Sequence, residues 1–120
     1  MKTKYILHGG AMRWQTEANK RYYREMAKGL TRPKVLLVYF AREDSEIPEL
    51  IERDHNNFAW ASPGVEIMYT VATEEKFVEQ VAAHDVILFV GGETQKLIDT
   101  VERTGIDLPE AFKGKVVSGS

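Results

Sequence analysis

The chain has 120 residues, enough for one domain with its own core, and its 43% hydrophobic and 28% charged residues are typical of a folded globular protein. A formal net charge of -2 gives no reason to expect binding to nucleic acid or to a membrane surface. No apolar run approaches the ~20 residues of a membrane span, and the apolar start is too short for a secretory signal, so we expect a cytoplasmic protein.

Cysteine is absent, which excludes disulfides, thiolate metal sites and a cysteine nucleophile within these residues. The three histidines, His8, His55 and His84, have neither of the short His-x-His or His-x-x-x-His spacings of a zinc site. We therefore expect neither a metal nor a cofactor.

Strand and helix patterns alternate along the whole chain. Apolar runs predict strands at residues 5–7, 35–40, 65–71, 86–90 and 116–117. Amphipathic patterns predict helices at residues 16–28 and 94–104, and a third that starts near residue 47 and ends before Pro63. A fourth helix is expected to be capped by Thr73 and to have its apolar face at positions 77–82. One helical turn is expected near 109–112.

Strand–helix units of this length with buried apolar strands imply right-handed crossovers and a parallel sheet. The sequence therefore predicts a single α/β domain over residues 1–120. We expect a doubly wound, flavodoxin-like, three-layer αβα arrangement with a mostly parallel five-stranded sheet, the first strand near its centre. Ligands in such folds bind beyond the carboxyl ends of the strands. The candidate segments are therefore residues 8–10, 41–44, 72–73, 91–94 and 118–120.

Gly91-Gly92-Glu93-Thr94 is the strongest internal candidate for a binding site. Two glycines after a buried strand let the backbone approach a ligand, and the following helix presents free N–H groups and its positive dipole end. That combination suits a phosphate, a carboxylate or an oxyanion. The alternative is a tight strand–helix turn that needs glycine only for its shape. The spacing matches neither a Walker A loop nor a dinucleotide fingerprint.

Two further segments carry candidate side chains. His8-Gly9-Gly10 is similar to the oxyanion loop of some esterases, although a histidine making one backbone hydrogen bond is the simpler interpretation. The charged loop Arg42-Glu43-Asp44 either selects a charged substrate or is solvated and caps the next helix.

Ser118-Gly119-Ser120 follows the last strand and is typical of the first half of a nucleophile elbow, the strand–turn–helix device that lifts a serine above a parallel sheet. An elbow needs backbone donors for the oxyanion of its tetrahedral intermediate. They come from the residue after the nucleophile and from the turn after an adjacent strand. The Gly91-Gly92 turn, one strand–helix unit earlier, is placed to supply the second donor.

The run 86–97, followed after about two dozen residues by 114–120, resembles the peptidase E group of serine peptidases. This group belongs to the class I glutamine amidotransferase-like superfamily and includes the cyanophycinases. Its members show an apolar strand, a Gly-Gly-(Gly)-Asn-Thr-like turn, a helix with Gln-x-Leu-like residues, and then Gly-x-Ser-Ala-Gly. The resemblance covers the whole chain but only the N-terminal half of such a protein, and it implies a class I glutamine amidotransferase-like domain cut at the nucleophile elbow.

The resemblance implies a role for each matching residue. Gly91 and Gly92 match the turn that supplies an oxyanion-hole N–H, and Thr94 matches the family threonine. Glu93 stands where asparagine is more usual, with one glycine fewer. Gly119 matches the first glycine of the elbow and Ser120 the variable residue, so that the nucleophile is the next residue along. In a second register Ser120 is itself the nucleophile, with Ser118 in the place of the glycine.

The family's catalytic histidine and its acidic partner have no counterpart here, so we expect the 120-residue chain to be inactive. The longer protein would cleave a small peptide or amide by acyl transfer through a serine. Two alternatives stay open. One is a non-catalytic flavodoxin-like module that binds a small anionic ligand or nucleotide at Gly91-Gly92. The other is a fragment that pairs with a second chain, with self-association driven by the uncovered Val116-Val117.

Overall fold

The structure is a computed structural model and describes residues 2–8 and 14–120. Gly9 and Gly10 lie outside the described residues. The strands are β1 (Lys4–Leu7), β2 (Lys34–Val38), β3 (Met68–Val71), β4 (Val86–Phe89) and β5 (Val116–Gly119). The helices are α1 (Glu17–Ala27), the 3₁₀ turn η1 (Asp44–Glu46), α2 (Ile47–Ala61), α3 (Phe77–Ala83), α4 (Thr94–Thr104) and the short α5 (Leu108–Ala111).

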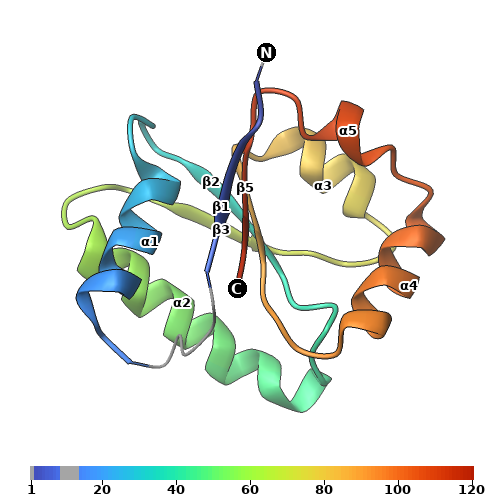
Figure 1. Cartoon of the computed structure of the whole chain (residues 1–120), viewed down its shortest axis with the longest axis horizontal. Coiled ribbons are helices and arrows are strands. Elements are labelled where there is room, and N and C mark those ends of the chain that lie inside the picture. Colours follow the sequence, from blue (N-terminus) through green and yellow to red (C-terminus); the bar gives the residue numbers. More distant parts are fainter. Residues whose placement is uncertain (1, 9–13) are drawn as a thin grey trace.

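The five strands form one sheet in the order β1-β5-β4-β2-β3, and every pairing is parallel. Helices α1 and α2 lie on one face, and α3, α4 and α5 lie on the other (Figure 1). The predicted doubly wound, flavodoxin-like, three-layer αβα fold is confirmed. The flavodoxin order is 2-1-3-4-5. If β2 is taken as the first strand, then β3, β2, β4 and β5 occupy the places 2-1-3-4, and β1 occupies the fifth place beside β5.

Several details of the expected layout are wrong. The first strand lies at an edge, not near the centre, because β5 occupies the position between β1 and β4. Since β5 is an inner strand, Val117 is buried in the core on the α3–α5 side, and the expected uncovered face at Val116-Val117 is absent. The strand expected from residue 65 begins at Met68, and the helix expected from Thr73 begins at Phe77. The Thr73 backbone N–H donates to the side chain of Gln80 at 3.0 Å, so this residue does not cap the helix.

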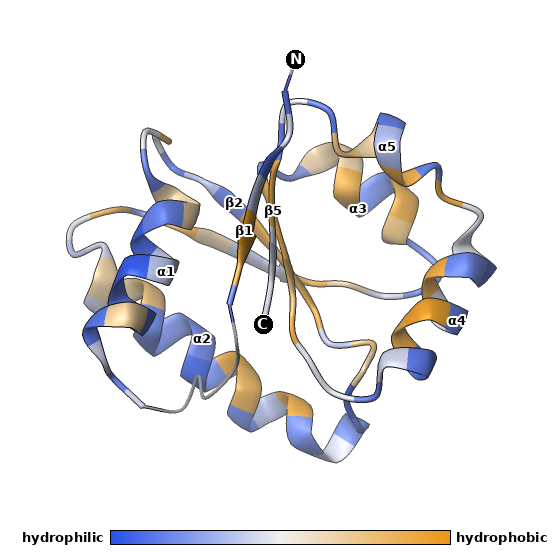
Figure 2. Cartoon of the chain, viewed as in Figure 1, coloured by the Kyte–Doolittle hydropathy of each residue, from blue (hydrophilic) through white to orange (hydrophobic). Residues whose placement is uncertain are grey.

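The two faces of the sheet have separate cores, as Figure 2 shows by the apolar residues gathered between the layers. Successive residues of β2 point to opposite faces, so that Leu37 packs under α1 and α2 while Leu36 packs under α3. The largest fully buried side chains are Tyr23 and Phe58 in the first core and Phe77 in the second. Both faces of the central strands are therefore buried, which explains their continuous apolar sequences.

The strand order defines a switch point. The chain steps from β1 to β2 to β3 with its helices on one face, then returns through β4 to β5 with its helices on the other. The connections that leave β2 and β4 therefore diverge to opposite faces at the carboxyl edge of the sheet. Ligands of open α/β sheets bind at such a point.

Candidate active site

The ends of β4 and β5 bring the predicted turn and elbow together. The Ser120 backbone N–H donates to the Phe89 carbonyl at 3.2 Å, which continues the ladder between the two strands. The Gly91 backbone N–H points at the Ser120 hydroxyl oxygen, 3.4 Å away. The prediction that two neighbouring strand ends carry these segments is confirmed. A backbone donor thus lies beside the Ser120 side chain.

Both glycines of the turn are required by packing. A Cβ atom on Gly91 would contact the Ser120 carbonyl oxygen, and a Cβ atom on Gly92 would contact the Ala41 carbonyl oxygen. Both distances would be well under 3.0 Å, which is closer than Cβ atoms approach other atoms in proteins. Neither glycine has a positive φ, so it is the approach of another backbone, not left-handed geometry, that excludes a side chain here.

The loop after β2 holds the turn in place. The Arg42 side chain donates from Nε to the Gly91 carbonyl oxygen, and its guanidinium pairs with Glu46 at 3.0 Å. The Glu93 backbone N–H donates to the Ala41 carbonyl at 2.9 Å. Lys96 donates to the Arg42 carbonyl at 3.0 Å. These contacts fix the carbonyl side of the turn and leave the Gly91 N–H directed at Ser120.

Glu93 and Thr94 lie where the turn enters α4. Thr94 is the first residue of the 11-residue helix, and Glu93 precedes it without a side-chain capping bond. Both side chains are exposed. They are therefore available to a ligand at the carboxyl edge of the sheet. Glu43 has the capping role that was one of the two predictions for the loop 42–44, because it forms a reciprocal capping box with Glu46 around η1.

Ser118 and Gly119 have different surroundings. Ser118 is buried on the α1 side, and its hydroxyl donates to the Met26 sulfur at 3.0 Å. Gly119 pairs with Leu7 of β1 and with Phe89 of β4. A Cβ on Gly119 would meet no atom within 4 Å.

His8 reaches the same edge of the sheet from β1. Its backbone N–H donates to the Gly119 carbonyl at 2.9 Å, and its half-buried ring packs on Tyr22 with 4.8 Å between the ring centroids. The other two histidines lie elsewhere. His55 stacks on Tyr69 beside β3, and buried His84 donates from Nδ1 to the Gln80 carbonyl at 2.6 Å before β4 begins.

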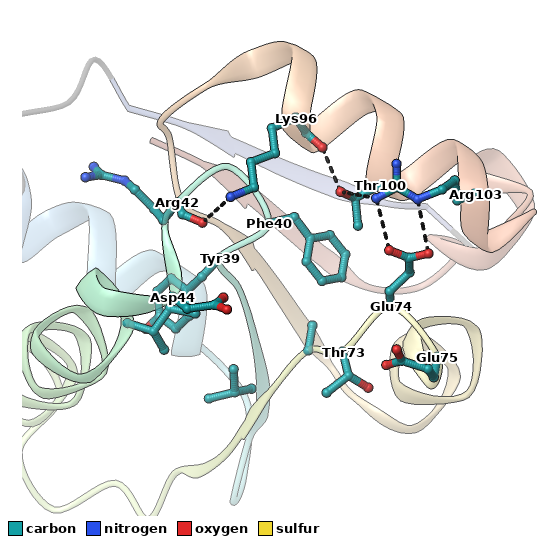
Figure 3. A pocket seen from close by; sticks show the side chains of 13 residues that line it. Tyr39, Phe40, Arg42, Asp44, Thr73, Glu74, Glu75, Lys96, Thr100 and Arg103 are labelled. Carbon is teal, nitrogen blue, oxygen red and sulfur yellow. Dashed lines mark hydrogen bonds and ion pairs between the residues drawn. The ribbon is translucent and has the colours of Figure 1, made fainter.

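A cavity of about 300 Å³ opens beside the turn at the carboxyl ends of β2 and β3 (Figure 3). Phe40 forms part of its apolar wall, and Asp44 projects from the opposite side. Its cations are engaged with protein groups: Arg103 pairs with Glu74 at 3.0 Å, and Lys96 is held by the Arg42 carbonyl. Sequence reasoning singled out part of its lining, the segments 41–44 and 72–73, and missed its contribution from α4.

Sequence reasoning also missed a buried carboxylate. Asp54 of α2 is fully buried and accepts hydrogen bonds from the Tyr23 and Tyr39 hydroxyls, each at 2.7 Å, with Arg53 at 3.1 Å. Burial raises the pKa of both tyrosines, and the negative charge of Asp54 raises it further. The cluster joins α1, α2 and the end of β2. Its signal in the sequence is an aspartate on the otherwise apolar face of the α2 pattern.

Among residues 2–8 and 14–120, no group of histidine, aspartate and glutamate side chains is arranged to hold a metal ion. None of the helices in this part of the chain combines the length and the apolarity needed to cross a bilayer.

The fold is that of an α/β protein in which the Gly91-Gly92 turn and the Ser118–Ser120 segment lie at adjoining strand ends. Neither a protein-family model nor a curated protein matches the sequence. Among solved structures, the chain is similar to a Listeria monocytogenes EGD-e protein solved under the name "Putative Peptidase E Protein", with a TM-score of 0.72 and 18% sequence identity. The match covers 99% of this chain and 59% of the Listeria chain, so this chain spans about three fifths of that protein's length. The chain therefore has a peptidase E-like fold.

Proposed function

We propose that this chain is the N-terminal portion of a peptidase E-like serine hydrolase of the glutamine amidotransferase-like superfamily. The observation that carries the proposal is the Gly91 N–H at 3.4 Å from the Ser120 hydroxyl, from a turn whose two glycines are required by packing. An oxyanion hole needs such a preorganised backbone donor beside the nucleophile. The fold of the Listeria protein supports the same assignment.

In the proposed reaction, the serine that follows Ser120 attacks the carbonyl carbon of a small peptide or amide, and a base takes its proton. The Gly91 and Gly92 N–H groups then stabilise the oxyanion, together with the N–H of the residue after the nucleophile. The amine leaves with the proton, and water hydrolyses the resulting ester.

The remaining site residues would contact the substrate. His8 and Gly119 lie at the ends of β1 and β5, and Glu93 and Thr94 follow the Gly91-Gly92 turn at the start of α4. We include Gly9 and Gly10 with them from the sequence alone. No cofactor enters this reaction.

The isolated 120-residue chain would be inactive. His55 and His84 lie away from the elbow, and the His8 ring packs on Tyr22 of α1. An oxyanion hole and substrate binding without nucleophile and base recover only about 10³–10⁴-fold of a triad enzyme's acceleration.

The test compares the 120-residue chain with the product of the natural reading frame that contains it. We expect the longer protein to hydrolyse a chromogenic amide and to be labelled by a fluorophosphonate on the residue after Ser120, and the short chain to do neither. Ser120→Ala separates the two registers, because labelling persists if Ser120 is the variable residue and disappears if it is the nucleophile. Turnover by the short chain at an enzyme's rate, or a longer protein that takes no label, would refute the proposal.

A further inference from the structure

Strand β1 has a free edge. Among the described strands it pairs with β5 alone. The N–H groups of Lys4 and His8 donate to the β5 side, to the carbonyls of Lys115 and Gly119, at 2.9 Å each. Because backbone groups alternate along a strand, Tyr5 and Leu7 present their N–H and C=O groups to the open side. The sheet therefore offers an unoccupied position for a further strand.

The same two residues expose apolar side chains. Leu7 is 84% exposed and Tyr5 is 62% exposed. Tyr5 is in register with Val117, which belongs to the core on the α3–α5 side. Neighbouring residues in register point to the same face of a sheet, so Tyr5 and Leu7 face that side. Figure 1 shows α3, α4 and α5 displaced from β1 on this face, over the other strands.

The handedness of the fold indicates what belongs there. The steps from β3 to β4 and from β4 to β5 move across the sheet toward β1, with α3, α4 and α5 on this face. Crossovers between parallel strands are right-handed. A further parallel strand continuing past β5 in that direction would place its helix on the same face, over Tyr5 and Leu7. Since β1 already occupies the place beside β5, that strand would lie at the free edge of β1.

Charge argues against a second copy of the chain as the occupant. Lys2 and Arg21 lie beside this edge, and Arg21 lines a shallow groove there with Leu7, whereas Lys4 is paired with Glu25 of α1 at 3.0 Å. An antiparallel pairing of two β1 strands would bring Lys2 and Arg21 toward their copies, and edge lysines are a common protection against such pairing.

We propose that the β1 edge, with the Tyr5 and Leu7 face, is the docking surface for the polypeptide that follows β5 in the longer protein. The Listeria chain has the required length, because a large part of it has no counterpart in this chain. The inference rests on the proposed function only in requiring a chain that continues beyond Ser120. The occupant is a helix with an apolar face followed by a strand.

The test measures amide hydrogen exchange at Tyr5 and Leu7 in the 120-residue chain and in the product of the natural reading frame. We expect exchange to slow at least about a hundredfold in the longer protein. Leu7→Lys should leave the melting temperature of the short chain nearly unchanged and lower that of the longer protein by roughly 5 °C or more. Met68→Lys is the matched control, because Met68 is a 55% exposed apolar residue on β3 at the opposite edge. It should have the same small effect in both proteins.

Equal exchange at Tyr5 and Leu7 in both proteins would overturn the inference, and so would a reading frame that ends after Ser120. A dimer of the short chain that Leu7→Lys abolishes would also overturn it. The inference and the proposed function fail separately. Hydrolysis with an unprotected β1 edge refutes the docking surface, whereas a protected edge without serine labelling refutes the hydrolase.

Discussion

Replacing Gly92 with alanine tests whether packing fixes the turn. The added methyl group would meet the Ala41 carbonyl oxygen, with the Ala41 carbonyl carbon at 3.0 Å and its Cβ at 3.1 Å. Ala41 is buried, and its oxygen already accepts from the Glu93 N–H, so this neighbour cannot yield freely. Overpacking of this kind costs about 1–3 kcal/mol, and the loss of glycine's freedom in the unfolded chain returns about 0.4–1 kcal/mol.

We therefore expect Gly92→Ala to lower the free energy of unfolding by about 1 kcal/mol. Urea unfolding followed by circular dichroism would show this as a midpoint lower by roughly 0.5–1 M, for a slope of about 1–2 kcal/mol per molar. Gly119→Ala is the matched control, since a Cβ there meets no atom within 4 Å. Its midpoint should equal or exceed that of the wild-type chain. The packing argument is refuted if the two variants unfold at the same urea concentration.

Three further predictions concern the contacts around the site. Arg42→Met removes the donor to the turn, and amide exchange at Glu93 should accelerate at least about tenfold, with unchanged exchange refuting the restraint. Asp54→Ala leaves two tyrosine hydroxyls and an arginine without their buried acceptor. Its free energy of unfolding in urea should fall by about 3 kcal/mol. Glu52→Ala is the control, because Glu52 is exposed on the same helix, and its midpoint should be unchanged. Burial raises the pKa of Tyr22 to about 12, above the ordinary tyrosine value of about 10. The folded state therefore holds this proton more tightly than the unfolded state does. The stabilisation that follows is present below pH 10 and is lost as the pH rises through 12. In a Tyr5→Phe chain, which lacks the 62% exposed tyrosine, phenolate absorbance should stay low near pH 10 and rise toward pH 12, and a full phenolate signal near pH 10 in the intact fold would contradict this.

The fold was accessible from the sequence because its evidence is local. Continuous apolar runs such as 35–38 and 86–89 can be buried on both faces only in a covered parallel sheet, and both runs became central strands. The place of β1 was not accessible. Its sequence is as apolar as that of an inner strand, yet Leu7 is almost fully exposed. Which strand pairs with which is decided by the length and direction of crossovers, and no local pattern carries that information.

The candidate site divides in the same way. The meeting of Gly91 and Ser120 could be predicted because consecutive parallel strands are often neighbours in a sheet. The contact of Arg42 with the turn could not be predicted, since it depends on β2 lying directly beside β4. Asp54 could have been predicted as a buried polar residue, because a carboxylate on an apolar helix face must either find donors or be expelled.

The steric and the chemical roles of the turn can be separated because its two glycines contact different partners. Gly92 packs against the buried residue Ala41, so alanine there acts on stability. Gly91 packs against the Ser120 carbonyl and keeps its N–H when it is replaced by alanine. The methyl group would push Ser120 away from that N–H without removing the donor. In a longer protein with an elbow at this position, Gly91→Ala should therefore lower the free energy of unfolding, as Gly92→Ala does, and in addition lower the kcat of the folded fraction. A turn that served packing alone would lose stability in both variants and would leave the kcat of the folded fraction unchanged.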